Sequence, residues 1–192
     1  MKQFVNISIS FIVVFLMMGQ TILCASDNKN HSEPTITFTT TTIMRKRINM
    51  PLKNQILHIF QQEKNAQGLF NLDLYHGYEG FLKRFSFFKD VFFEFKEDLA
   101  LLQIEEKIIG VLFFSKDNKT QELTISWVAI DEQFHNQGYG KKLLTKTLSQ
   151  YANYQANLDC YKHNEQACTF YKKNGFQITK TTDKCYHFSK QI

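Results

Sequence analysis

The stretch that decides the fold is "HNQGYGKK", residues 135–142, which places two glycines two positions apart in a chain with only 8 glycines among 192 residues. A β-like run, "ELTISWVAI" (122–130), ends just before it, and apolar residues recur at helical spacing after it. Glycine permits a positive φ and close approach of a ligand, and the first turn of a helix presents N–H groups with partial positive charge. The stretch therefore predicts a strand–turn–helix unit that binds a phosphate or pyrophosphate, with a purely structural turn as the alternative.

Hydrophobic periodicity on either side of this unit predicts the remaining elements. Strands are expected at 35–43, 99–106, 107–116, 122–130, 155–162, 176–182 and 185–190. Helices are expected at 50–65, 81–95, from about 138 onward, and at 165–174, with residues 66–80 as a loop. The order is β-α-α-β-β-β-α-β-α-β-β, and the three consecutive strands before the turn favour an antiparallel meander. The fold class is therefore α/β (α+β), a mixed and mostly antiparallel sheet flanked by helices.

Several other classes of protein are disfavoured. No GxxxxGK[ST] stretch occurs, and three strands rather than one βαβ unit precede the turn, so neither a P-loop nor a Rossmann site is expected. The net charge of +5 is too mild for a dedicated nucleic-acid binder. No CxxC pair occurs and the His and Cys residues are scattered, so no metal site is expected.

Two motifs resemble the GNAT N-acetyltransferase superfamily. "AIDEQFHNQGYGKKLL" (129–144) is similar to the acyl-CoA motif R/Q-x-x-G-x-G/A and the V/I-D-x-x-Y/F element before it. "LDCYKHNEQACTFYKKNGF" (158–176) is similar to L-x-V-x-x-x-N-x-x-A-x-x-F-Y-x-x-x-G-F, matching at Asn164, Ala167, Phe170, Tyr171, Gly175 and Phe176. The resemblance implies the GNAT fold for a domain at 35–192. It also implies direct transfer of an acetyl group from acetyl-CoA to an amine.

The resemblance also implies roles for single residues. Backbone amides of the turn are expected to wrap the CoA pyrophosphate: His135, Asn136, Gln137, Gly138, Tyr139 and Gly140, with Lys141 adding charge. Ile130 is expected to pair with the pantetheine arm, and an N–H near it to polarise the thioester. Asn164 is expected to contact CoA, and Tyr171 to protonate the leaving thiolate, with a tyrosine of the core as the alternative for Tyr171. His135 stands where the family usually has Arg or Gln, which implies weaker phosphate affinity.

The general base and the acceptor are less determined. The family often places a Glu on the fourth strand, and Glu122, on the same strand face as Thr124, is the candidate. A water held by Thr124 or Ser126 is the alternative. The acceptor is expected to be an amine on a small molecule or a protein. The rival function is a non-catalytic GNAT-like domain that binds CoA or a protein partner.

The N-terminus has the pattern of a signal peptide or signal anchor. Lys2 precedes the apolar run "ISFIVVFLMM" (9–18), and small residues follow it. Residues 1–25 are expected to direct export, or to anchor the chain in a membrane through residues 7–25 if uncleaved, and 26–34 to form a linker. A cytoplasmic protein is the alternative. Cleavage leaves Cys160, Cys168 and Cys185, an odd number that does not suggest a disulfide framework.

Overall fold

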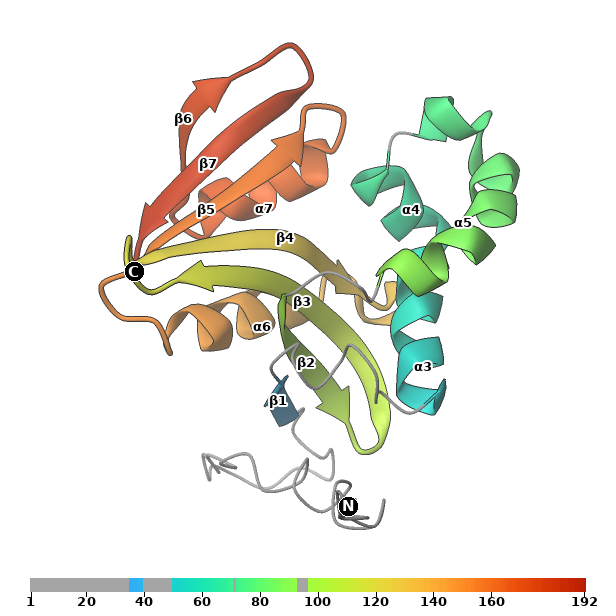
Figure 1. Cartoon of the computed structure of the whole chain (residues 1–192), viewed down its shortest axis with the longest axis horizontal. Helices are drawn as coiled ribbons and strands as arrows, with labels where there is room; N and C mark the ends of the chain where they lie inside the picture. The colour runs from blue at the N-terminus through green and yellow to red at the C-terminus, as the bar shows by residue number, and fades with distance from the viewer. Residues whose placement is uncertain (1–34, 40–49, 71, 93–96) are drawn as a thin grey trace, which may run out of the picture.

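The computed structural model describes residues 35–39, 50–70, 72–92 and 97–192 (Figure 1). The expected signal segment at 1–25, the linker at 26–34 and the second half of the strand predicted at 35–43 lie outside the described residues. Within the described ranges, no helix combines the length and the apolar character needed to cross a membrane.

Most of the predicted elements are present. The strands are β1 (Thr35–Thr39), β2 (Asp98–Ile104), β3 (Lys107–Asp117), β4 (Glu122–Ile130), β5 (Gln155–Tyr161), β6 (Gln177–Thr181) and β7 (Cys185–Gln191). The α-helices are α3 (Met50–Gln61), α4 (Glu63–Leu69), α5 (Tyr78–Phe92), α6 (Tyr139–Leu148) and α7 (Glu165–Lys173). Two short 3-10 helices, η1 (Leu72–Tyr75) and η2 (Glu132–Phe134), complete the order.

One prediction is wrong at the helix expected for 50–65. The chain leaves helical geometry at Gln62, which has φ −58° and ψ 138°, and a second helix, α4, starts at Glu63. The loop predicted at 66–80 is therefore largely helical, because it holds the end of α4 and all of η1. The break has a tertiary cause, since the Gln62 side chain is bonded to residues that follow β4.

The seven strands form one sheet in the order β1-β2-β3-β4-β5-β7-β6. All neighbouring strands are antiparallel except β4 and β5, which are parallel and pair only at Glu122–Ile125 with Gln155–Leu158. Beyond these four pairs β4 and β5 part (Figure 1). The register of β3 and β4 shifts at the same place, where Phe113 faces Trp127 and Phe114 faces Ile125, so Ser126 is an extra residue. Such a bulge bends a strand and increases its twist, which turns β4 away from β5.

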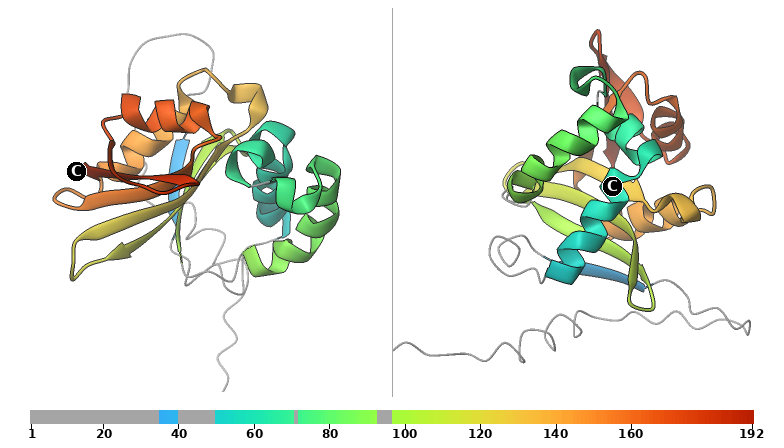
Figure 2. Two further views of the ribbon diagram at one scale, coloured as in Figure 1. Left: turned by 90° about the horizontal axis from the view of Figure 1, so that it is seen from above. Right: turned by 90° about the vertical axis from the view of Figure 1, so that its right-hand side faces the viewer.

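Two hydrophobic cores lie on the two faces of the sheet, with α6 and α7 on one face and α3 to α5 on the other (Figure 2). Alternation along β2 distributes its side chains: Ala100 and Leu102 pack under α6, whereas Leu99 and Leu101 pack under α3 and α5. The Phe-rich stripe of α5 contributes Phe81 and Phe85, each 1% exposed. The other rings of that stripe lie outside the described side chains.

The described residues cover only half of the second face of the sheet. Its core draws strand residues from β2, β3 and β4, and none from β5, β6 or β7 among the described side chains. On β5 the residues Ala156, Leu158 and Cys160 are buried under α7, whereas Asp159 and Tyr161, on the other face, are exposed. The uncovered half of this face therefore lies beside the place where β4 and β5 part.

A first prediction concerns the core under α7. Phe188, 1% exposed, pairs with Ile178, 38% exposed, on the neighbouring strand. Phe188→Ala is expected to lower the free energy of unfolding by about 3–5 kcal/mol because it removes a buried ring and leaves a cavity. Ile178→Ala is the matched control and should cost less than about 1 kcal/mol. Urea unfolding measures both, and equal losses would contradict the packing described.

Candidate functional site

The turn after β4 has the geometry that its glycines predicted. Gly138 has φ +82° and caps α6, and Asn136 also has a positive φ of 60°. The first bond of α6 runs from the Lys142 N–H to the Gly138 carbonyl, at 3.0 Å. The N–H groups of Tyr139, Gly140 and Lys141 therefore lie outside the hydrogen-bond ladder of the helix and point toward its N-terminal end. A negatively charged group is stabilised at this position.

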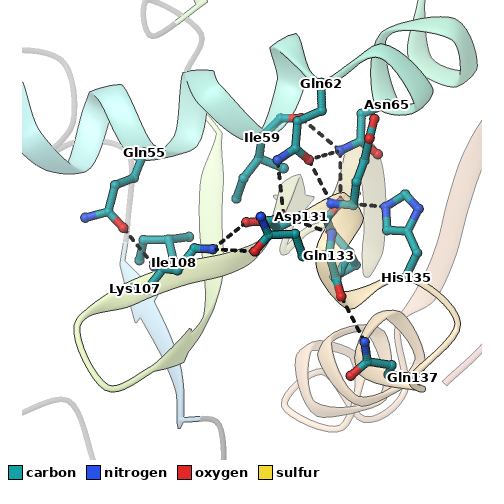
Figure 3. Close-up of polar contacts among 12 residues, drawn as sticks. Gln55, Ile59, Gln62, Asn65, Lys107, Ile108, Asp131, Gln133, His135 and Gln137 are labelled. Atoms are coloured by element: carbon teal, nitrogen blue, oxygen red, sulfur yellow. Dashed lines mark hydrogen bonds and ion pairs between the residues drawn. The ribbon is translucent and has the colours of Figure 1, made fainter.

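His135 does not contribute an amide to that set. Its N–H donates to the Glu132 carbonyl at 3.2 Å, and its ring Nε2 lies 2.7 Å from the Ile130 carbonyl (Figure 3). The side chain thus closes the turn onto the end of β4. The amides that the turn exposes therefore begin after His135. The stretch that can present amides to an anion is shorter than residues 135–140, which the sequence predicted.

The end of β4 presents backbone groups to the space left by β5. The Asp131 N–H donates to the Ile109 carbonyl of β3 at 2.8 Å. Because bonding groups alternate along an antiparallel strand, the N–H groups of Val128 and Ile130 point away from β3, into that space. The Ile130 carbonyl on the same side accepts the bonds from His135 and from the Asn65 amide, the latter at 2.9 Å. Donors therefore line one wall of the space that β4 and β5 enclose.

A cavity of about 450 Å³ lies at this end of β4. Its walls come from α4, the end of β4, the turn, and α7, and they include Asn65, Gly68, Ile130, Gly138, Lys141 and Phe170. The cavity therefore touches helices on both faces of the sheet, and the turn amides lie at one of its walls. An elongated molecule can lie in it with an anionic group at the turn and its other end near Val128.

Asn164 also lines the cavity, but with two fixed contacts. Its Oδ1 accepts from the Ala167 N–H at 3.0 Å, which caps α7, and its Nδ2 donates to the Gly68 carbonyl at 2.9 Å. The second contact joins α7 to α4 across the cavity. A Cβ at Gly68 would lie 2.7 Å from Nδ2, so only glycine leaves room for this bond.

A buried polar network holds the α3–α4 junction against the end of β4 (Figure 3). Asp131, 2% exposed, accepts from Gln62 at 3.2 Å and pairs with Lys107 at 3.0 Å. Gln62 in turn accepts from the Glu132 N–H at 2.8 Å, and Asn65 donates to the Ile59 and Ile130 carbonyls. The network fixes the wall of the cavity that α4 supplies.

The charge of Asp131 is stabilised by its partners. Burial by itself raises the pKa of Asp131, but hydrogen bonds from Lys107, the Gln133 N–H and Gln62 outweigh it, so the pKa lies below its ordinary value. Asp131 is therefore ionised at neutral pH, and its negative charge balances Lys107 beside the turn.

Tyr171 lies on α7 within the core rather than on the cavity wall. It is 9% exposed and contacts the rings of Phe170, Phe176 and Phe188 at centroid distances of 5.3, 5.8 and 6.0 Å. Burial, with smaller contributions from Cys160 and Cys168, raises the pKa of its hydroxyl. The hydroxyl is therefore protonated at neutral pH, and its neighbour Phe170 is the residue that reaches the cavity.

Glu122 is not brought to the cavity. It is exposed at the first residue of β4, accepts from the Thr120 hydroxyl at 3.3 Å, and lies six residues, about 20 Å of extended strand, before Val128. Ser126 lies closer, at the bulge, and its hydroxyl donates to the Glu97 carboxylate. This contact places the Glu97 carboxylate at the bulge, although neither Glu97 nor Ser126 lines the cavity, and sequence reasoning missed it.

The sequence also gave no sign that Gln62 and Asn65 bond to residues at and after the end of β4, which are 65–70 positions away. Their local pattern is that of an ordinary polar helix face. The one available signal was Asp131, an acidic residue at the end of an apolar strand, which the resemblance treated only as part of the motif.

Comparisons with known proteins agree with this fold. The sequence model of the Acetyltransferase (GNAT) family matches residues 57–176, and no curated protein matches the chain. The PaiA N-acetyltransferase of Thermoplasma acidophilum, in complex with coenzyme A, aligns with a TM-score of 0.56 and 12% identity, over 82% of this chain and 99% of that one.

Two ribosomal-protein acetyltransferases align similarly. The ribosomal-protein-S18-alanine N-acetyltransferase of Escherichia coli has a TM-score of 0.52 and 16% identity, over 80% of this chain and 92% of that one. The ribosomal L7/L12 alpha-N-protein acetyltransferase RimL has a TM-score of 0.58 and 12% identity, over 90% and 100%. At these identities the alignments establish the fold.

The network yields a prediction about pH. Because the pKa of Asp131 is lowered in the folded protein, its contribution to stability is present above the unfolded value near 3.9 and is lost as the pH falls through the folded pKa. Asp131→Asn is expected to lower the free energy of unfolding at pH 7 by about 2 kcal/mol, and the difference from wild type should shrink below about pH 4. Urea unfolding at several pH values measures it. Glu106→Gln, which removes an exposed charge next to Lys107, is the control, and a pH-independent gap for Asp131→Asn would contradict the assignment.

Proposed function

Since the chain belongs to the GNAT acetyltransferase family, we propose that it is an N-acetyltransferase that moves the acetyl group of acetyl-CoA directly to a primary amine. The single observation that carries the proposal is the cavity of about 450 Å³ that joins the turn amides to the N–H groups at the end of β4. It has an anion site at one wall and a row of carbonyl-polarising donors at another.

The geometry suits a long thioester. The pyrophosphate is held by the N–H groups of Tyr139, Gly140 and Lys141, with the Lys141 side chain adding positive charge. The pantetheine arm lies along Val128 and Ile130, in place of the strand partner that β5 does not supply there. The thioester oxygen then faces an N–H of β4, which stabilises the negative charge that develops as an amine attacks.

Proton transfers complete the reaction. Tyr171 stays the sequence-based candidate for the acid, although its side chain lies in the core under α7 and not on the cavity wall. Glu122 stays the sequence-based candidate for the base, although about 20 Å of strand separates it from Val128. Glu97, held by Ser126, is the structural candidate for the same role.

The acceptor enters from the uncovered half of the sheet. The face that carries Asp159 and Tyr161 is exposed beside the cavity, so an amine on a small molecule or on a protein segment has access to it. The second candidate function is a non-catalytic domain that retains coenzyme A. The observation that favours it is His135, whose ring is bound to the Ile130 carbonyl where the family usually has a phosphate-binding side chain.

Calorimetry with acetyl-CoA tests the binding step. The wild-type protein is expected to bind, and Gly138→Ala to bind at least about tenfold more weakly, because φ +82° is strained for alanine by about 1–2 kcal/mol and the amides of the turn shift. Gly77→Ala is the matched control, since Gly77 has φ +92° and, like Gly138, no atom within 4 Å of an added Cβ. It should cost similar stability and leave the affinity unchanged. Absence of wild-type binding would overturn the proposal.

Thiol release in the presence of a panel of primary amines tests turnover. Tyr171→Phe is expected to lower kcat by about 10²-fold or more with little change in acetyl-CoA affinity, since it removes only the acid. If Glu97 is the base, Glu97→Gln should lower kcat and Glu122→Gln should change kcat less than about twofold. The opposite result would assign the role of base to Glu122. Binding without turnover for any amine would favour the non-catalytic domain.

A further inference from the structure

Two buried thiols lie in contact beside the core of α7. The Sγ atoms of Cys160, on β5, and Cys168, on α7, are 3.2 Å apart, and each residue is 5% exposed. The Cys168 thiol also contacts the Tyr161 carbonyl at 3.5 Å, which fixes its direction toward the strand. A covalent S–S bond is about 2.05 Å long, so the two sulfurs need to approach by about 1 Å, within the reach of small side-chain rotations.

The third cysteine of the domain is placed differently. Cys185 pairs with Tyr161 and Tyr186 pairs with Cys160, so Cys185 shares the exposed sheet face of Tyr161. Cys160 points to the opposite face, where α7 packs. Because successive side chains of a strand alternate between faces, Cys185 cannot bridge to Cys160 or Cys168 without turning a strand over.

We propose that Cys160 and Cys168 form a reversible disulfide bond that joins β5 to α7, and that Cys185 stays a free thiol. The three cysteines that remain after the expected cleavage, an odd number, did not suggest a disulfide framework from the sequence. In the structure Cys160 and Cys168 lie in contact, and Cys185 lies apart from them on the other face of the sheet.

The reaction balances as two thiol–disulfide exchanges with a small disulfide such as oxidised glutathione. One thiolate attacks the glutathione disulfide, forms a mixed disulfide and releases one glutathione. The second thiolate then attacks the protein sulfur of the mixed disulfide and releases another glutathione. The protein loses two electrons and two protons, and oxidised glutathione is reduced to two molecules of glutathione.

Burial of the two thiols affects how fast the disulfide forms rather than whether it forms. Burial, together with the bond from Cys168, raises the pKa of the Cys160 thiol, so little thiolate is present in the folded protein. Oxidation is therefore slow in the native state and fast when the chain folds in an oxidising buffer. Once formed, the bond is shielded by the same burial.

The bond would act on the proposed site through α7. This helix carries Tyr171 and the cavity residues Ala167 and Phe170, and β5 is the strand that parts from β4. A covalent link between β5 and α7 limits how far that wall of the cavity can move. The bond itself does not depend on the proposed function, so its test is independent of acetyl-CoA.

The full chain is unfolded in urea and refolded in a glutathione redox buffer, so that burial does not block access, and is compared with protein refolded in dithiothreitol. After alkylation of free thiols, peptide mapping of the full chain is expected to show Cys160 linked to Cys168, with Cys24 and Cys185 alkylated and the intact mass of the unalkylated protein lower by the two hydrogens. The loop is short, and the oxidised form should show a urea midpoint higher by about 1 M.

Serine variants complete the design. Cys185→Ser, the matched control, should form the same link, whereas Cys160→Ser and Cys168→Ser should show neither the link nor the midpoint shift. Three outcomes would overturn the proposal: alkylation of both Cys160 and Cys168 after oxidative refolding, an intramolecular bridge that contains Cys185, or a linked protein with a lower urea midpoint than the reduced form.

Discussion

The parting of β4 from β5 is the constraint on which the rest of the structure depends. Four residue pairs hold the two parallel strands together, and the bulge at Ser126 then turns β4 away. Backbone groups that lose a strand partner inside a protein need other partners, because an unpaired buried polar group is costly. The Ile130 carbonyl finds them in Asn65 and His135, whereas the N–H groups of Val128 and Ile130 face the cavity. The same strand edge thus supplies an acceptor for internal hydrogen bonds and two N–H groups to the cavity.

The same edge explains why the α3–α4 junction is built as it is. A helix break at Gln62 frees its side chain to reach Asp131 and the Glu132 N–H, and it turns Asn65 toward Ile130 (Figure 3). The polar groups are buried but mutually bonded, so they fix one arrangement of α4 against β4. Asn164, at the start of α7, adds a second contact through its bond to the Gly68 carbonyl. The helix α4 is therefore bonded both to the end of β4 and to α7.

Several features of the fold were predictable because their causes are local. The alternation in β2 to β4, the Phe spacing in α5 and the glycines of the turn each report on neighbours within a few residues. The helix at 50–65 was mispredicted because nothing near Gln62 encodes the break; its partners lie 69 and 70 positions away. Glu97 was missed for the same reason, since Ser126, its partner, lies 29 positions away along the chain, with β2 and β3 between them.

By itself, the sequence determined most of the elements in their order and the strand–turn–helix unit around Gly138, because periodicity and the positive φ of a glycine are properties of short segments. Only the tertiary structure decided which side chains meet. It places the His135 ring on the Ile130 carbonyl rather than at the expected phosphate site, leaves Glu122 at the far end of β4, and brings Cys160 and Cys168, two of the domain's three cysteines, into contact. The physical reason is that strand pairing and helix packing bring together residues whose separation along the chain carries no pattern.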